Sequence, residues 1–294
     1  WGEIPNFKCF GYYGGMPKLN LKNPEVEKYI TDVACYWIKE CDIDGWRLDV
    51  GDEISHFFWK NFRKAVKAVK KDMLIIGEIW HYAGDFLEGD EWDTVMNYPF
   101  YLNLIDLLAD EKITVSQFVQ NLGYLKGRLH KNCYPLMWNL IDSHDTARFL
   151  HLCNDNKKKQ HLAAAFQLLL PGMPMIYYGD EYAMPGANDP DCRRGMYWDE
   201  EYQDKEMYEW YKRLIQVRKS HACIVEGELA GSVTEDEEGT VVLIRKNGEE
   251  TIAMIFNCSS SAKKFNEYTQ KYNLLTENTF DGNVEGFDAA VIVL

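Results

Sequence analysis

Up to about residue 220 the chain alternates short apolar runs with stretches of helical periodicity. The apolar runs occupy residues 44–50, 74–80, 94–100, 135–142 and 173–178. A strand that is buried on both faces reads as a near-continuous apolar run. Strands that alternate with helices pair in parallel through right-handed crossovers. We therefore predict an α/β domain that contains five parallel strands.

Capping residues support the predicted helices between these runs. Asn23 suits an N-cap and Pro24 the first helical position of a helix that reaches Cys41. A second helix presents apolar residues from 58 to 69 on one face. Thr114 and Gln117 have the spacing of a capping box and open a third helix. Further helices are predicted near 157–170 and 202–219.

The pattern changes after about residue 222, where short strands follow one another without helices. Residues 240–245 and 251–257 are apolar, and the Lys246-Asn247-Gly248 segment between them suits the turn of a β-hairpin. Residues 287–294 supply a closing strand. This pattern predicts a small antiparallel β-sandwich that packs on the larger domain.

Three acidic residues stand at the ends of apolar runs: Asp49, Glu78 and Asp145. The carboxyl ends of parallel strands share one edge, where open sheets and (β/α) barrels build their active sites. Paired carboxylates are the groups that hydrolyse glycosides, because one protonates the leaving oxygen and the other attacks or activates water. Arg47 shares a strand face with Asp49, so its charge would keep Asp49 ionised.

Each of these residues also has an ordinary structural explanation. A single Asp at a strand end is usually a loop or capping residue, and an Arg near an Asp is usually a structural ion pair. A single His such as His144 is more often packed than catalytic. The three acids in order, with Trp46, Trp80 and Trp138 as aromatic neighbours, favour a sugar-binding active site.

Composition excludes several other classes of protein. The net charge is −14 and no basic run occurs, which argues against nucleic acid or an anionic membrane surface as a partner. No apolar stretch is long enough to span a membrane. The eight cysteines form no CxxC pair, which favours reduced thiols and a cytoplasmic setting. The N-terminus resembles an internal cut, so the sequence leaves open whether a secretory signal peptide was removed.

At these motifs the chain resembles the α-amylase superfamily of glycoside hydrolases (family thirteen). DGWRLDV resembles the strand-four motif, which implies that Asp49 is the nucleophile and Arg47 its partner. GEIW resembles the strand-five motif, which implies that Glu78 is the general acid/base and that Trp80 contacts substrate.

The resemblance continues towards the C-terminus. LIDSHD resembles the strand-seven motif, which implies that Asp145 stabilises the transition state and His144 binds substrate. PGMPMIYYGDE resembles the strand-eight segment.

Two further stretches resemble one branch of the family. MPKLN at 16–20 resembles the motif of neopullulanases, cyclomaltodextrinases and maltogenic amylases. NDPDCR resembles their loop after strand eight, which implies that Asp189 and Arg193 bind the sugar one unit beyond the cleaved residue. Together these matches favour this branch over oligo-1,6-glucosidases and branching enzymes.

Several parts of the family's pattern have no counterpart in this chain. The resemblance implies strands four to eight of a (β/α)8 TIM barrel over residues 1–221 and a C-terminal all-β sandwich over 222–294, as the C-terminal part of a longer enzyme. The first three strands and the branch's N-terminal dimerisation module are absent. Gly51-Asp52-Glu53 replaces a frequent Ala-Asn-Glu, which leaves acceptor preference open. Unpaired strand edges favour a homodimer or association with the missing N-terminal half.

The implied function is a retaining glycoside hydrolase that cleaves α-1,4-glucosidic bonds of cyclodextrins, maltooligosaccharides, pullulan or starch. The alternative is a catalytically impaired, amylase-like fragment that acts as a carbohydrate-binding or interaction protein. No cofactor is predicted, and the calcium sites of the family draw on regions that a full-length enzyme would add. The preferred glucan and the balance of hydrolysis and transglycosylation stay open.

Overall fold

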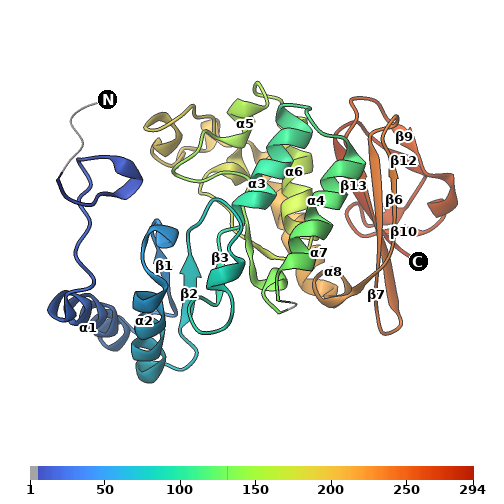
Figure 1. Cartoon of the computed structure of the whole chain (residues 1–294). Helices are drawn as coiled ribbons and strands as arrows, with labels where there is room; N and C mark the ends of the chain where they lie inside the picture. Colours follow the sequence, from blue (N-terminus) through green and yellow to red (C-terminus); the bar gives the residue numbers. More distant parts are fainter. Residues whose placement is uncertain (1–5, 131) are drawn as a thin grey trace. The chain divides into compact units, whose positions relative to one another are not determined.

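The computed structural model describes residues 6–130 and 132–294 (Figure 1). The chain divides into two compact units. The first comprises Trp1–Met96 with Arg128–Met137, and the second comprises Asn97–Gly127 with Trp138–Leu294. No helix among the described residues is long and apolar enough to cross a membrane. All eight cysteines are free.

A three-stranded parallel sheet with two helices forms the first unit. Its order is β1-β2-β3, and Arg47 of β1 is opposite Ile76 of β2. The Asn23 side chain caps the first helix by accepting a hydrogen bond from the Glu25 amide, as predicted. The elements are α1 (Pro24–Cys41), β1 (Gly45–Leu48), α2 (His56–Val69), β2 (Leu74–Gly77) and β3 (Thr94–Val95), with 3-10 turns at Phe10–Tyr12, Gly51–Glu53, Gly84–Phe86 and Tyr134–Leu136.

The second unit begins with helices around a two-stranded parallel sheet, in which β4 pairs with β5. Thr114 and Gln117 form the predicted capping box, because each side chain bonds to the other residue's amide. The elements are α3 (Tyr98–Leu104), a π-helix (Ile105–Ala109), α4 (Val115–Arg128), β4 (Trp138–Asn139), α5 (Phe149–Leu152), α6 (Lys157–Leu169), β5 (Met173–Pro174), α7 (Lys205–Ser220) and α8 (Ala222–Glu226), with 3-10 turns at Asp180–Tyr182, Asp191–Arg193 and Glu200–Tyr202.

An antiparallel β-region completes the second unit. Its six-stranded sheet has the order β11-β10-β13-β8-β7-β6, and β12 pairs separately with β9. The elements are β6 (Glu228–Glu235), β7 (Thr240–Asn247), β8 (Glu250–Asn257), β9 (Lys263–Lys264), a 3-10 turn (Asn266–Tyr268), β10 (Tyr272–Asn273), β11 (Asn278–Thr279), β12 (Asn283–Val284) and β13 (Asp288–Val293). The boundary predicted between residues 221 and 222 lies between α7 and α8 and stays a prediction.

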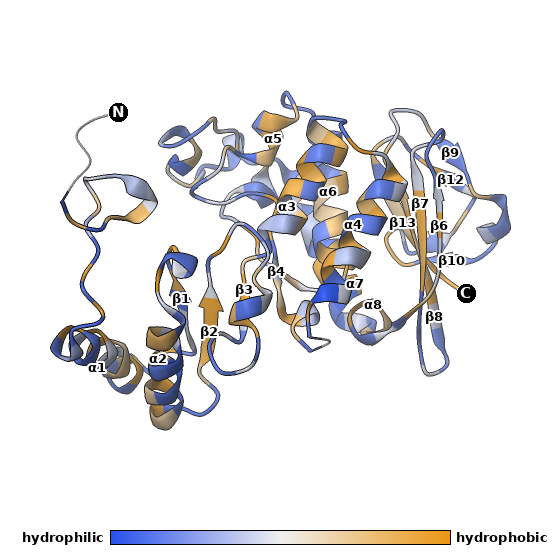
Figure 2. Ribbon diagram, viewed as in Figure 1, coloured by the Kyte–Doolittle hydropathy of each residue, from blue (hydrophilic) through white to orange (hydrophobic). Residues whose placement is uncertain are grey.

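The core of the second unit is continuous from its helices to its sheet. Helix α6 is buried along most of its length, and Phe166 stacks on Phe256 of β8 with ring centroids 4.2 Å apart. Figure 2 colours β2 of the first unit and much of β7 of the second unit as hydrophobic. Burial of this kind accounts for the apolar runs read from the sequence.

The predicted strands are present but several are shorter than expected. The run at 94–100 forms only the two residues of β3, because Asn97 then caps helix α3 by accepting from the Phe100 amide. Periodicity alone cannot separate a buried strand from a buried helix start. The hairpin turn also differs by one residue, because Asn247 pairs with Glu250 and Gly248, at φ +60°, takes the first central position.

Candidate active site

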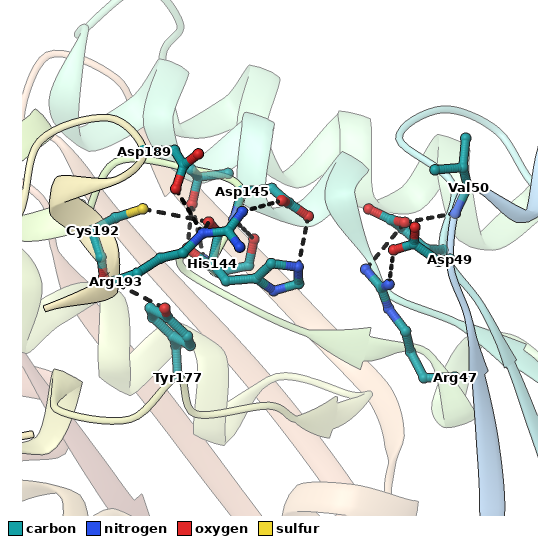
Figure 3. Close-up of polar contacts among 12 residues, drawn as sticks. Arg47, Asp49, Val50, His144, Asp145, Tyr177, Asp189, Cys192 and Arg193 are labelled. Carbon is teal, nitrogen blue, oxygen red and sulfur yellow. Dashed lines mark hydrogen bonds and ion pairs between the residues drawn. The ribbon is translucent and has the colours of Figure 1, made fainter. Parts of the chain in front are cut away.

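In the first unit, Arg47 joins two of the predicted catalytic acids (Figure 3). One guanidinium nitrogen hydrogen-bonds the Asp49 carboxylate, and Nη2 lies 3.1 Å from Glu78 Oε2. The parallel register explains this contact, since the Glu78 amide donates to the Leu48 carbonyl at 2.9 Å. The Asp49 side chain is 72% exposed, whereas that of Glu78 is 5% exposed. One acid is therefore open to a ligand while the other is held inside.

The Glu78 side chain is oriented by further donors. The Val50 amide donates to Oε2 at 2.8 Å, and the indole of Trp80 donates to Oε1 at 3.2 Å. Val50 has φ +46°, a left-handed conformation that is unfavourable for a β-branched residue. Strain of about 1–3 kcal/mol is typical of functional sites, and here it accompanies the turn that aims this amide at Glu78. Sequence reasoning missed Val50, because a backbone donor leaves no side-chain signal.

Two glycines let a tryptophan pack under this cluster. A Cβ at Gly51 would lie 2.7 Å from Trp92 Cζ2, and one at Gly77 would overlap the same indole. Trp92 is buried and stacks on Phe86 with centroids 4.1 Å apart. This contact explains why position 51, in the turn after Asp49, is glycine rather than alanine.

The branch motif at 16–20 is tied to the segment that follows Asp49. Lys18 Nζ lies 2.6 Å from Glu53 Oε2, and the Gly11 amide donates to Oε1 at 2.9 Å. Burial raises the pKa of Glu53, but these donors outweigh it and the pKa is lowered overall. Two motifs that are separate in sequence therefore meet in the first unit.

In the second unit, the other predicted site residues form one polar cluster (Figure 3). Asp145 Oδ2 lies 3.1 Å from His144 Nε2, and Asp145 Oδ1 lies 3.1 Å from Arg193 Nη2. Arg193 Nε is 2.7 Å from Asp189 Oδ1 and also donates to the His144 carbonyl at 2.9 Å. All four side chains are partly exposed, so the cluster can accept hydroxyl groups of a ligand.

A buried polar network behind this cluster was not predicted. Arg148 forms a 2.9 Å ion pair with Asp180, and Asp142 lies beside them. The signal that could have identified it is a charged residue within an otherwise apolar segment, as at Asp142. Among residues 6–130 and 132–294, no group of three or more His, Cys, Asp or Glu side chains could hold a metal ion.

Comparison with known proteins defines the family. The alpha-amylase catalytic domain matches residues 5–202, so the chain belongs to the alpha-amylase family. Its fold is accordingly the C-terminal part of a (β/α)8 barrel, strands four to eight, followed by a small antiparallel β-sandwich.

Several relatives carry the names of the branch that the sequence motifs indicated. The chain is 46% identical over 258 residues to a cyclomaltodextrinase of Geobacillus thermopakistaniensis, covering 88% of this chain and 44% of that protein. It is 43% identical over 253 residues to an intracellular maltogenic amylase of Bacillus subtilis, covering 86% and 43%. A solved cyclomaltodextrinase structure superposes with a TM-score of 0.92 at 34% identity, covering 98% of this chain and 52% of that one. The chain thus spans about half the length of the relatives it matches.

Proposed function

We propose that this chain carries the catalytic residues of a retaining glycoside hydrolase that cleaves α-1,4-glucosidic bonds. Cyclodextrins, maltooligosaccharides, pullulan and starch are the proposed substrates, in line with the names of the relatives. The observation that carries the proposal is the position of Arg47, whose guanidinium contacts both Asp49 and Glu78. An exposed carboxylate and a buried one, held by a shared cation, suit a nucleophile and an acid/base.

The proposed reaction has two steps. An Asp49 oxygen bonds to the anomeric carbon while the glycosidic C–O bond breaks and Glu78 gives its proton to the leaving oxygen. Glu78 then removes a proton from water, whose oxygen displaces Asp49 and restores both carboxyl groups. General acid–base catalysis of this kind typically contributes about 10²–10⁴-fold. Retention of configuration follows from the two displacements.

We assign substrate contacts to the remaining predicted residues. Asp145 and His144 would bind hydroxyls of the distorted sugar ring, and Asp145 would stabilise its developing positive charge. Asp189 and Arg193 would bind the sugar one unit beyond the cleaved residue. Trp80 keeps an exposed indole surface on which a sugar ring can pack.

The partners and the setting of the protein are also proposals. An α-glucan is the proposed ligand, and we propose either a homodimer or association with a segment that supplies the first three barrel strands. The relative named as an intracellular maltogenic amylase supports a cytoplasmic location. The carbohydrate-binding or interaction protein is the alternative function, and it has no specific contact in its favour.

The test is to incubate the chain with β-cyclodextrin and maltohexaose and to follow the sugars released. Asp49→Asn should abolish release, since the amide is a poor nucleophile. Asp44→Asn is the matched control, because Asp44 precedes the same strand and binds the surface residue Lys70. Release by Asp49→Asn would refute the assignment. If the unsubstituted chain released no sugar but bound β-cyclodextrin in calorimetry, the alternative function would be favoured.

A further inference from the structure

Two buried carboxyl groups and one guanidinium form a compact trio in the second unit. Asp142, Arg148 and Asp180 are each 1% exposed. Arg148 Nη1 lies 2.9 Å from Asp180 Oδ1, and Asp142 Oδ2 accepts the Phe149 amide at 2.8 Å. The trio brings together the segments that follow β4 and β5.

The arrangement of the trio favours a proton held between its two carboxyl groups. The Asp142 and Asp180 carboxyl groups are neighbours close enough to interact directly. The Phe149 amide and Arg148 Nη1 each contact one oxygen of the pair, and the other two oxygens, Asp142 Oδ1 and Asp180 Oδ2, have no donor among the described residues. Ionised carboxylates only accept hydrogen bonds, so two neighbouring carboxyl groups can bond to each other only if they hold a proton between them. Burial raises the pKa of both groups, and repulsion between them raises that of Asp180 further.

A single shared proton also balances the buried charge. One carboxylate and one guanidinium then cancel, whereas two carboxylates would leave an uncompensated buried negative charge. Unpaired buried charges are strongly destabilising. The neutral trio is therefore the state that this interior can hold.

Arg148 connects the trio to the loop that reaches Asp145. Its side chain donates to the Tyr178 carbonyl at 2.7 Å and to the Cys192 carbonyl at 3.2 Å. Its amide donates to the Gly186 carbonyl at 2.9 Å. The next residue after Cys192 is Arg193, which binds both the His144 carbonyl and Asp145.

We propose that Asp142 and Asp180 share one proton and, through Arg148, act as positioning residues that hold Arg193 against Asp145. The catalytic consequence rests on the proposed function, whereas the shared proton does not. The two parts are therefore tested by different measurements.

The first experiment is a double-mutant cycle with Asp142→Asn, Asp180→Asn and the double variant. In either single variant an amide N–H replaces the shared proton and one carboxylate still balances Arg148. In the double variant two amides face each other and the buried cation loses its counter-ion.

Hydrogen-exchange mass spectrometry should therefore show segments 142–149 and 186–193 protected to within about threefold of the original chain in both single variants. The double variant should exchange at least about tenfold faster. The proposal would be overturned if a single variant exchanged as fast as the double variant, or if the exchange rate of the double variant did not change.

The second experiment remains decisive if the double variant fails to fold. Above about pH 4 an unfolded Asp is ionised, whereas the folded pair keeps its proton, so the stability of the original chain falls as pH rises towards the raised folded pKa. Asp180→Asn lacks this proton, so its melting temperature should rise relative to the original chain from pH 5 to pH 8. A difference that is constant with pH would rule out the shared proton.

The neighbouring groups do not obscure this measurement. The titratable and charged groups that face the pair are Arg148, Tyr101 and Tyr211. Burial raises the pKa of both tyrosines, so they stay neutral over this range. Asp204→Asn is the matched control. Burial raises the pKa of Asp204, but hydrogen bonds from Lys157 and the Met207 amide lower it overall. The difference in melting temperature between Asp204→Asn and the original chain should therefore not change with pH above pH 5.

Cleavage of β-cyclodextrin tests the catalytic part. Both single variants should retain kcat/KM to within about threefold and the double variant should lose at least about tenfold, because only the latter releases Arg193. The positioning role would be refuted if the double variant cleaved β-cyclodextrin at the rate of the original chain while its segment 186–193 had lost protection from hydrogen exchange. Absence of cleavage by the original chain would count against the proposed function, while exchange and pH dependence would still decide the shared proton.

Discussion

Arg47 Nη2 lies 3.1 Å from Glu78 Oε2, and the same guanidinium also binds Asp49. A planar fork of donors can serve two carboxylates at once, which a single ammonium group cannot do with the same geometry. The guanidinium thus sets the relative position of the two proposed reacting groups within the first unit.

Replacing Arg47 with Lys should separate the effect of charge from that of geometry. We expect kcat for β-cyclodextrin to fall on the order of 10²-fold, because one of the two carboxylates loses its donor. Arg63→Lys is the matched control, since Asp93 keeps its contact with Lys67 at 2.8 Å. Equal activity of Arg47→Lys and the original chain would contradict a role for the shared guanidinium.

Gly77→Ala should destabilise the first unit by about 1–3 kcal/mol, because the added methyl overlaps the buried Trp92 ring. Gly123→Ala is the control, since nothing lies within 4 Å of its Cβ position on α4. That change should be neutral or stabilising by up to about 1 kcal/mol. Urea denaturation followed by tryptophan fluorescence measures both. A Gly77→Ala variant as stable as Gly123→Ala would show that Trp92 can move aside.

Arg193→Met should lower kcat/KM by about 10–100-fold, because hydrogen bonds to charged groups contribute about 1.5–3 kcal/mol. Arg194 offers a neighbouring control, since its side chain pairs with Asp191. Arg194→Met should stay within about twofold of the original chain, and steady-state assays with maltohexaose compare the two. Similar losses in both variants would indicate general damage to the loop.

Asp288→Asn should become relatively more stable as pH rises from 4 to 6. Burial raises the pKa of Asp288 to about 6, so the folded chain holds a proton that the unfolded chain has lost. The stability of the original chain should therefore fall across this window by about 1 kcal/mol, reduced from the full shift because the side chain is 33% exposed. Thermal unfolding at pH 4 and pH 7 gives the comparison. An identical difference at both pH values would exclude a raised pKa.

The elements and the family could be predicted from the sequence, because both depend on local patterns. Apolar runs located the five parallel strands, and capping residues such as Asn23 and Thr114 placed helix starts correctly. Strand lengths were wrong at residues 94–100, because Asn97 caps a helix inside an apolar run. Motifs around Asp49, Glu78 and Asp145 were sufficient to indicate the alpha-amylase family, which the comparisons confirmed.

By itself, then, the sequence determined which residues end the strands and which family the chain belongs to. Only the tertiary structure decided that one guanidinium serves both Asp49 and Glu78, and that Asp142 and Asp180 are buried beside each other. The Arg47–Glu78 and Asp142–Asp180 pairs join positions 31 and 38 residues apart in the sequence, across neighbouring strands or loops. Contacts between distant positions depend on register and burial, and no local pattern of residues records either one.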